Sequence, residues 1–177
     1  MFGTYFYHQT SRKMVVAFGT LFNTIEVRRT NSSDEVTEVV KIPLSYGPKD
    51  KMLARFTSDP NLSSSVALTV PRMGFELTSI AYDSSRKLTK KNRMRKVDAN
   101  NPLQMQYQYA PAPYNLGFTL SVMVKNTDDG LQIIEQIMPY FTPDYTVTIN
   151  TVPDMGDKRD IPIILDNMSQ EDTYEGD

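Results

Sequence analysis

Segments with strand character outnumber helical ones along this chain of 177 residues, and this pattern constrains the fold more than any other feature. Alternating hydrophobic side chains are typical of strands, and hydrophobic spacing of three to four residues is typical of helices. Strands are predicted at residues 24–29, 36–45, 66–70, 74–82, 104–109, 116–124, 145–152 and 160–165. Two principal helices are predicted at residues 11–22 and 128–139, with a short helix after Pro48. We therefore expect an α+β fold in which a mixed, mainly antiparallel sheet packs with two principal helices.

Local signals refine the limits of these elements. The polar stretch between the first two predicted strands indicates a hairpin, and the alternation within residues 74–82 changes phase, which predicts a register shift. Short side chains that carry an oxygen atom, such as those of Ser, Thr and Asp, cap helices by accepting hydrogen bonds from the free N–H groups of the first turn. Thr10 or Ser11 is therefore expected to cap the first principal helix. Asp128 or Asp129 is expected to cap the second.

The composition is typical of a globular chain, with 40% hydrophobic and 23% charged residues. No run approaches the roughly 18 apolar residues that a membrane span requires. The absence of cysteine excludes disulfide frameworks, thiolate zinc sites and cysteine nucleophiles. Residues 1–165 are expected to form a single domain, followed by an acidic, mobile tail at 166–177. The first residues lack the apolar core of a secretory signal, so a cytoplasmic origin is expected.

Charge is divided unevenly along the chain, although the formal net charge is only −2. Residues 1–126 carry 17 Lys and Arg against 9 Asp and Glu, a net of +8. Residues 127–177 carry 2 against 12, a net of −10. Such a division fits two parts that face one another, copies that associate head to tail, or parts that meet different partners. The sequence leaves these three arrangements open.

The densest cluster of charge lies at residues 86–96, which hold seven basic side chains and no acidic one. Because repulsion among these cations opposes packing, we expect a long exposed loop here. Such a loop could bind phosphates of nucleic acid, although no aromatic residue interleaves the cations to stack on bases. The alternatives are a solvated loop, or one that pairs with acidic surface on another protein or another copy. The seven cations are Arg86, Lys87, Lys90, Lys91, Arg93, Arg95 and Lys96.

Little in the sequence indicates catalysis. The single histidine, His8, lies in an aromatic N-terminal arm without a motif around it, so a structural role is favoured. No P-loop or G-x-G-x-x-G pattern is present, and Asp154, Asp157 and Asp160 do not match a calcium loop. We interpret these three carboxylates as solvated and expect no enzymatic activity, no cofactor and no metal. A hydrolase with paired carboxylates is the weakest alternative, because one sequence cannot reveal such pairs.

One specific motif, Glu-Gln-Ile-Met-Pro-Tyr-Phe-x-Pro, occupies residues 135–143 and occurs together with an aromatic start at residues 1–7. Weaker segments accompany them in collinear order: Leu21 and Phe22 with Ile25 and Arg28, residues 42–46, residues 109–113 and residues 158–161. Together these segments resemble the proximal tail sheath stabiliser, or tail-completion, family of T-even-like contractile-tailed bacteriophages. The resemblance spans almost the whole chain.

The resemblance departs from the family pattern in two places. Members of the family continue beyond the segment at 158–161 with further strand-forming sequence, whereas this chain ends at Asp177. Either the sheet is incomplete here or the chain is shortened. The segment at 86–96 is also more strongly cationic than the family pattern.

The resemblance implies a structural protein of the virion and no enzyme. Such proteins form a six-fold ring at the head-proximal end of the tail, where they cap the tube, hold the last sheath disc and meet the neck. The implied partners are further copies of the chain, tail sheath and tube proteins and neck proteins, with non-specific contact to DNA in the channel and no membrane. The implied location is the virion tail at its neck junction, with assembly in the host cytoplasm.

A closed ring of identical copies needs two different complementary surfaces on each copy, and opposite charge can steer their association. We expect the segment at 86–96 to contact acidic surface on a neighbouring copy or on the tail, or else to line the DNA channel. Lys158 and Arg159 join the seven cations as candidate interface residues. The alternative function is a nucleic-acid-binding module that uses the same basic segment.

Overall fold

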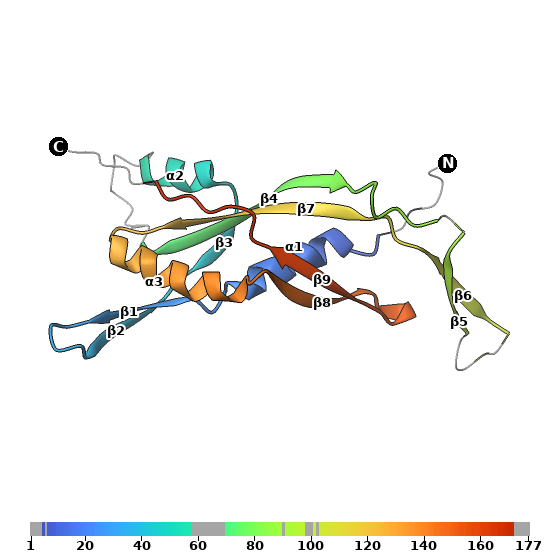
Figure 1. The fold of residues 1–177 in the computed structure, drawn as a ribbon, viewed down its shortest axis with the longest axis horizontal. Coiled ribbons are helices and arrows are strands. Elements are labelled where there is room, and N and C mark those ends of the chain that lie inside the picture. Colours follow the sequence, from blue (N-terminus) through green and yellow to red (C-terminus); the bar gives the residue numbers. More distant parts are fainter. Residues whose placement is uncertain are drawn as a thin grey trace.

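The computed structural model describes residues 5, 7–57, 70–89, 91–97, 101 and 103–171. The molecule is elongated, and two β-hairpins project from its opposite ends (Figure 1). In chain order the helices and strands are α1 (Thr10–Leu21), β1 (Glu26–Thr30), β2 (Val36–Lys41), β3 (Leu44–Tyr46), α2 (Lys49–Thr57), β4 (Arg72–Tyr82), β5 (Arg93–Val97), β6 (Met105–Tyr109), β7 (Tyr114–Met123), α3 (Thr127–Ile137), β8 (Asp144–Val152) and β9 (Asp157–Ile164). Short 3₁₀ turns follow α3 and β8.

The described strands form a three-stranded sheet in the order β3-β4-β7 and three two-stranded ribbons, β1-β2, β5-β6 and β8-β9. Strand β3 runs parallel to β4, and the other pairs are antiparallel. The predicted α+β class, with mainly antiparallel pairing and two principal helices, is confirmed. The strands are nevertheless divided among four separate sheets, where a single sheet was expected.

Helices cover both faces of the central sheet, with α2 on one side and α1 and α3 on the other (Figure 1). The ring of Phe18 in α1 stacks on Phe118 of β7 at a centroid distance of 4.4 Å. Gly19 permits this close approach, because a Cβ at that position would lie 2.8 Å from the ring of Phe75. Gly74 faces the other side of the sheet, where Met52 of α2 occupies the space that a Cβ would need.

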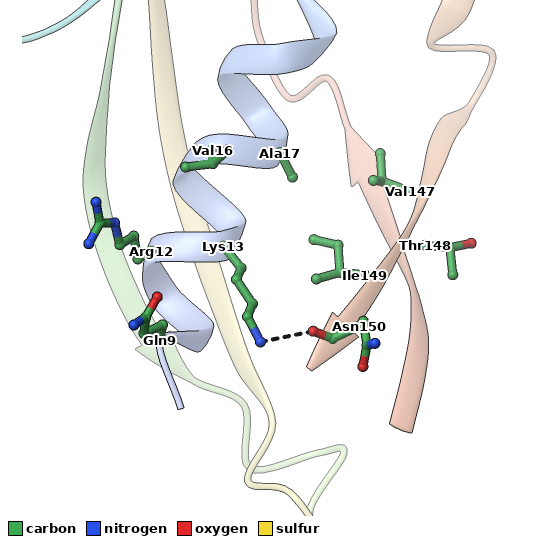
Figure 2. A pocket seen from close by; sticks show the side chains of 9 residues that line it. All are labelled: Gln9, Arg12, Lys13, Val16, Ala17, Val147, Thr148, Ile149 and Asn150. Carbon is green, nitrogen blue, oxygen red and sulfur yellow. Dashed lines mark hydrogen bonds between the residues drawn. The ribbon is translucent and has the colours of Figure 1, made fainter. Parts of the chain in front are cut away.

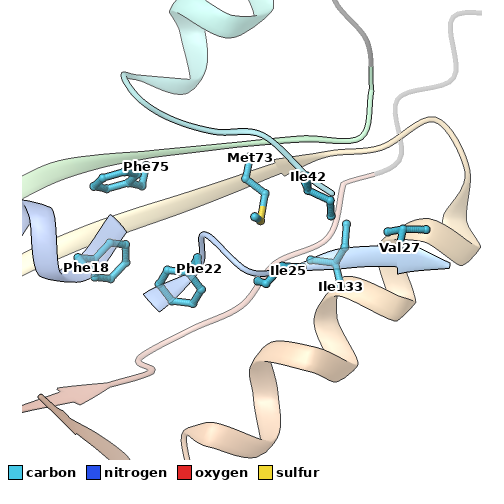
Figure 3. Close-up of a cluster of buried hydrophobic side chains, with 8 residues drawn as sticks. All are labelled: Phe18, Phe22, Ile25, Val27, Ile42, Met73, Phe75 and Ile133. Carbon is cyan, nitrogen blue, oxygen red and sulfur yellow. The ribbon is translucent and has the colours of Figure 1, made fainter. Parts of the chain in front are cut away.

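The hydrophobic core lies between the central sheet, α1, the base of β1 and α3 (Figure 3). Its four most buried side chains come from four different segments and are each less than 2% exposed: Val27, Ile42, Met73 and Ile133. Burial of each such side chain contributes about 1.5–3 kcal/mol to folding. The core therefore fixes α1 and α3 against the sheet.

The predicted strand at 36–45 is divided into two strands that belong to different sheets. Strand β2 pairs with β1, whereas β3 pairs with β4. The division falls at Pro43, which has no N–H group with which to continue a ladder. The N–H of Ile42 still donates to the carbonyl of Ile25, at 3.1 Å, and the carbonyl of Pro43 accepts from the N–H of Met73, at 3.0 Å.

Glutamine side chains of α3 satisfy the outer edge of β1. The Nε2 atom of Gln136 donates to the carbonyl of Glu26 at 2.8 Å, and the N–H of Arg28 donates to Oε1 of Gln132 at 3.1 Å. A free strand edge exposes unpaired N–H and carbonyl groups that favour non-specific strand pairing. These amides therefore replace a neighbouring strand and join the helix to the hairpin.

Both capping predictions are wrong. The residues that precede α1 and α3 are Gln9, in the left-handed region with φ 56°, and Asn126, and neither side chain makes a capping hydrogen bond. Thr10 already lies inside the first helical turn. The Asp129 carboxylate faces β1 instead, where its Oδ2 lies 3.5 Å from Nη2 of Arg29. Tertiary pairing has replaced local capping at this position.

Several other predictions can be compared with the described residues. The first hairpin is confirmed as β1-β2, and the register shift in β4 is confirmed between Leu77 and Ser79. Most of the strand predicted at 66–70 lies outside the described residues, as do residues 172–177 of the acidic tail. Residues 166–171 are exposed and have no regular secondary structure. No helix among the described residues is long and apolar enough to cross a bilayer.

Candidate interface

The basic segment at 86–96 is only partly a loop, which corrects the sequence interpretation. Residues 93–96 of the segment belong to β5. This strand pairs with β6 in the hairpin that projects at one end of the molecule (Figure 1). The register places Arg93 opposite Tyr109 and Arg95 opposite Tyr107. Repulsion among neighbouring cations, taken alone, predicts a loop. Contacts with aromatic side chains across the ribbon offset that repulsion.

Alternation along the two strands places six exposed side chains on one face of the ribbon. The guanidinium of Arg93 lies 4.8 Å from the ring centroid of Tyr109 and 5.7 Å from that of Tyr107. The two tyrosine rings meet edge to face at 5.7 Å, and each residue is more than half exposed. We call this surface the Arg–Tyr face, and its residues are Arg93, Arg95, Val97, Met105, Tyr107 and Tyr109.

The opposite face of the ribbon is attached to the β8-β9 hairpin through a buried carboxylate. Oδ2 of Asp157 accepts hydrogen bonds from Thr151 Oγ1 at 2.7 Å, Arg159 Nε at 2.9 Å and Gln108 Nε2 at 3.5 Å. Asp157 is only 6% exposed, so its interpretation as a solvated loop carboxylate is wrong. Since Gln108 belongs to β6, this cluster, which we call the Asp157 anchor, fixes the base of the ribbon.

The anchor also changes the acidity of Asp157. Burial raises the pKa of this carboxyl, whereas the hydrogen bond from Thr151 and the guanidinium of Arg159 lower it. The lowering effects prevail, and the pKa of Asp157 lies below its ordinary value. The carboxylate is therefore ionised at neutral pH and offsets the charge of Arg159.

The predicted interface cations lie in different environments. Arg86 pairs with Asp83, with Nε and Oδ2 2.6 Å apart, and also donates to Asn115. Hydrogen bonds from Ser85 and Arg86 hold the pKa of Asp83 well below its usual range. Lys87, Lys91 and Lys158 are exposed but do not belong to the paired residues of the ribbon. Lys90 lies outside the described residues.

Lys96 lies on β5, on the face opposite to the tyrosines, and Arg159 lies on β9 in the Asp157 anchor. Arg159 and Arg93 line the same open groove of about 330 Å³ at the base of the ribbon. The structure thus brings these two predicted residues together, although they are far apart in sequence. It does not bring all nine predicted cations onto one surface.

A second open groove, of about 400 Å³, lies between α1 and β8 (Figure 2). Lys13 spans it, and its Nζ donates to the carbonyls of Asn150 at 3.0 Å and Thr151 at 2.9 Å. The residues that line this groove include no carboxylate and no histidine. A nucleophile with a positioned base is therefore not found here.

The histidine and the carboxylates are the other groups that catalysis or metal binding would use. His8 is exposed immediately before α1. Within the part of the chain that the structure describes, no group of three or more His, Asp and Glu side chains is arranged to hold a metal ion.

The motif segments identified in the sequence mostly lie in the framework of the fold. Phe22, Ile25 and Ile42 belong to the buried core, and the ring of Phe141 packs against Phe22 at a centroid distance of 6.4 Å. Gln136 completes the edge of β1. A likeness carried by these residues therefore reports the fold, and of the Arg–Tyr face it includes only Tyr109.

Comparison with known proteins agrees with this likeness. The profile of the T4-like virus Myoviridae tail sheath stabiliser family matches residues 5–177. The tail completion protein gp15 of Enterobacteria phage T4 is 28% identical over 189 residues, an alignment that covers 100% of this chain and 66% of that protein. The chain thus spans about two thirds of the length of this relative. Because the family profile matches nearly the whole sequence, the chain belongs to the T4-like Myoviridae tail sheath stabiliser family.

Proposed function

We propose that this chain is a structural protein of a contractile phage tail that forms a ring at the head-proximal end. There it caps the tube, stabilises the last sheath disc and joins the tail to the neck. The observation that carries the proposal is the family match over residues 5–177. The relative in phage T4 is a tail completion protein, which supports the same role.

The shape of the molecule supports assembly with copies of itself. Hairpins β1-β2 and β5-β6 project at opposite ends of an elongated body (Figure 1). A ring of identical subunits uses a heterologous contact, in which two different surfaces meet and the rotation between copies closes. Two distinct ends on one chain provide such a pair of surfaces, and we propose that they form a hexamer.

The proposed partners follow from this position. Sheath and tube proteins contact the ring on its tail side, and neck proteins contact it on its head side. The protein assembles in the host cytoplasm and remains in the virion at the neck junction. No step in this role makes or breaks a covalent bond, and no cofactor is needed.

A second candidate function is binding of nucleic acid by the ribbon. The observation in its favour is the exposure of Tyr107 and Tyr109 beside Arg93, since arginine and aromatic side chains together bind phosphates and stack on bases. Such a contact would occur in the channel of the ring or independently of assembly. A steep decrease of DNA affinity with salt concentration would indicate it.

Addition of the purified chain to tails that lack the family protein tests the proposed function. The tails contain tube and extended sheath, and a sample without the chain serves as control. Negative-stain images after dilution should show that the chain keeps the sheath extended and adds a ring at one end. Equal loss of sheath with and without the chain, and no density at either end, would contradict the proposal.

A further inference from the structure

The outer side of helix α3 exposes acidic and hydrophobic side chains in a single stripe. Asp128, Leu131 and Glu135 of α3 and Met138, the first residue of the 3₁₀ turn that follows, are spaced by three and four residues, which places them on one side of the helix. Leu131 is 49% and Met138 44% exposed, and both acids are exposed. The same helix buries Ile133 completely. We call these four residues the α3 stripe.

The α3 stripe and the Arg–Tyr face complement one another. The stripe carries two carboxylates beside two exposed aliphatic side chains. The Arg–Tyr face carries Arg93 and Arg95 beside two tyrosines and the exposed Val97 and Met105. Interfaces combine an apolar centre, rich in Tyr, Met and Arg, with complementary charge. Both surfaces therefore expose hydrophobic side chains, and their charges are opposite.

The spacing of the charges is also compatible. Arg93 and Arg95 lie on the same face of β5, about 7 Å apart along the strand. Asp128 and Glu135 lie about 10 Å apart along the axis of α3. Arginine side chains are long and flexible enough to reach two carboxylates whose spacing is larger than that of the arginine backbone positions. Each guanidinium can bind a carboxylate through two parallel hydrogen bonds.

The two surfaces lie in different parts of the molecule, so they cannot meet within one copy. Helix α3 lies on the side of the β1-β2 hairpin, whereas the β5-β6 ribbon projects at the opposite end (Figure 1). A contact between them must join two copies, and the second copy then offers its own ribbon to a third. This is the heterologous arrangement that generates a ring when it closes.

We propose that the Arg–Tyr face of one copy docks on the α3 stripe of the next copy in the ring. This inference rests on the proposed function and names the surfaces that carry it out. Guanidinium groups of the ribbon pair with Asp128 and Glu135, and the tyrosines cover Leu131 and Met138. The Asp157 anchor holds the ribbon in the orientation that this contact requires.

Docking on protein fits the ribbon better than binding to DNA. The guanidinium of Arg93 already lies against the tyrosine rings, so their faces are partly covered and less open to bases. Only two cations belong to the Arg–Tyr face, and Val97 and Met105 give it an apolar part that phosphates cannot satisfy. The acidic residues after 127 provide the matching charge within the same chain.

Charge reversal on each surface tests the contact. The variants are Arg93→Glu with Arg95→Glu, Asp128→Lys with Glu135→Lys, and the combination of all four. Each reversal should weaken association on the order of tenfold to a hundredfold, and the combination should restore a large part of it. Sedimentation velocity and ring counts on tail ends measure association. The matched control is Lys49→Glu with Lys51→Glu on α2, on the other side of the central sheet from α3, and it should assemble normally.

Circular dichroism and thermal unfolding verify that each variant folds. Reversal variants that fold and assemble like the original chain would overturn the docking proposal. Failure of the combined variant to recover any association would also overturn it. Loss of DNA binding by the Arg93→Glu, Arg95→Glu variant, with assembly unchanged, would assign the ribbon to nucleic acid instead.

Cross-linking gives an independent test, because the chain contains no cysteine. Single variants Arg95→Cys and Leu131→Cys are mixed, allowed to assemble on tail ends and treated with a flexible bis-maleimide. The mixed pair should give a cross-linked dimer, whereas Lys87→Cys mixed with Leu131→Cys should not. Rings without the 95–131 cross-link would overturn this inference and leave the proposed function intact, whereas absence of rings and of sheath retention with the unmodified chain would defeat both.

Discussion

The body of the molecule and the β5-β6 ribbon are ordered by different interactions. The body buries the side chains of Phe18, Ile42 and Ile133 between helices and sheet. The ribbon buries little, and a two-stranded hairpin alone is at best marginally stable in water. The hydrogen bond from Gln108 to the Asp157 anchor attaches it to the body, and the packing of Arg93 over two tyrosines joins its two strands. Substitutions should therefore separate into those that unfold the protein and those that change only its contacts.

The largest expected effect is on the body. Ile133→Ala removes a fully buried side chain and leaves a cavity between α3 and the sheet. We expect the free energy of unfolding to decrease by about 2–5 kcal/mol. Leu131→Ala, on the exposed side of the same helix, is the matched control and should change it by at most about 0.5 kcal/mol. Denaturant unfolding of both variants measures the difference, and equal effects would contradict the assignment of the buried face.

An intermediate effect is expected at the junction between body and ribbon. Asp157→Asn keeps the size of the side chain but removes the negative charge of the carboxylate, whose Oδ2 pairs with Arg159 and accepts a hydrogen bond from Thr151. The expected loss of unfolding free energy is about 1–3 kcal/mol. Hydrogen exchange should also become faster in β5 and β6 than in β4 and β7. Uniform acceleration through all strands would show that the anchor does not act on the ribbon.

Acid should reveal the same junction without any substitution. The pKa of Asp157 is lowered from 3.8, so its contribution to stability is fully present above that pH and is lost as the pH falls through the lowered value. The difference in unfolding free energy between the original chain and Asp157→Asn should therefore shrink on acidification below about pH 4. Denaturant titrations at several pH values measure it. A difference that stays constant down to the acid limit would contradict the lowered pKa.

The smallest effect on stability is expected on the ribbon itself. Tyr109→Ser removes one ring from beneath the guanidinium of Arg93, a contact worth about 0.5–1 kcal/mol at an exposed site. The free energy of unfolding should decrease by no more than this amount, whereas association between copies should weaken clearly. Sedimentation velocity measured beside thermal unfolding separates these two outcomes. A large loss of stability with normal association would contradict the claim that the ribbon contributes to contacts between copies and little to stability.

The sequence predicted well those elements whose signal is local. Hydrophobic spacing located α1 and α3, and the change of alternation located the register shift at Leu77 and Ser79. These features follow from side chains that are close in sequence and point to one face. The family resemblance was visible for the same reason, since its segments supply core residues such as Phe22 and Ile42.

The sequence could not reveal features that depend on distant partners. Arg93 and Tyr109 stabilise β5 only through cross-strand pairing, so a rule based on neighbouring charge predicted a loop. Asp157 looks like a solvated carboxylate until Thr151 and Gln108 are placed around it. Alternation in residues 104–109 and in 93–97 was the signal that could have predicted the ribbon, because each run places its tyrosines or arginines on one face.

The central claim is that copies of this chain close one end of a phage tail. A Ser33→Cys variant tests it most directly, because this residue is exposed in the turn of the β1-β2 hairpin and the chain has no other cysteine. The variant is labelled with maleimide gold, added to tails that lack the family protein and imaged by electron microscopy. The account predicts gold confined to a ring at the head-proximal end. Gold spread along the sheath, or equal labelling of both ends, would contradict it.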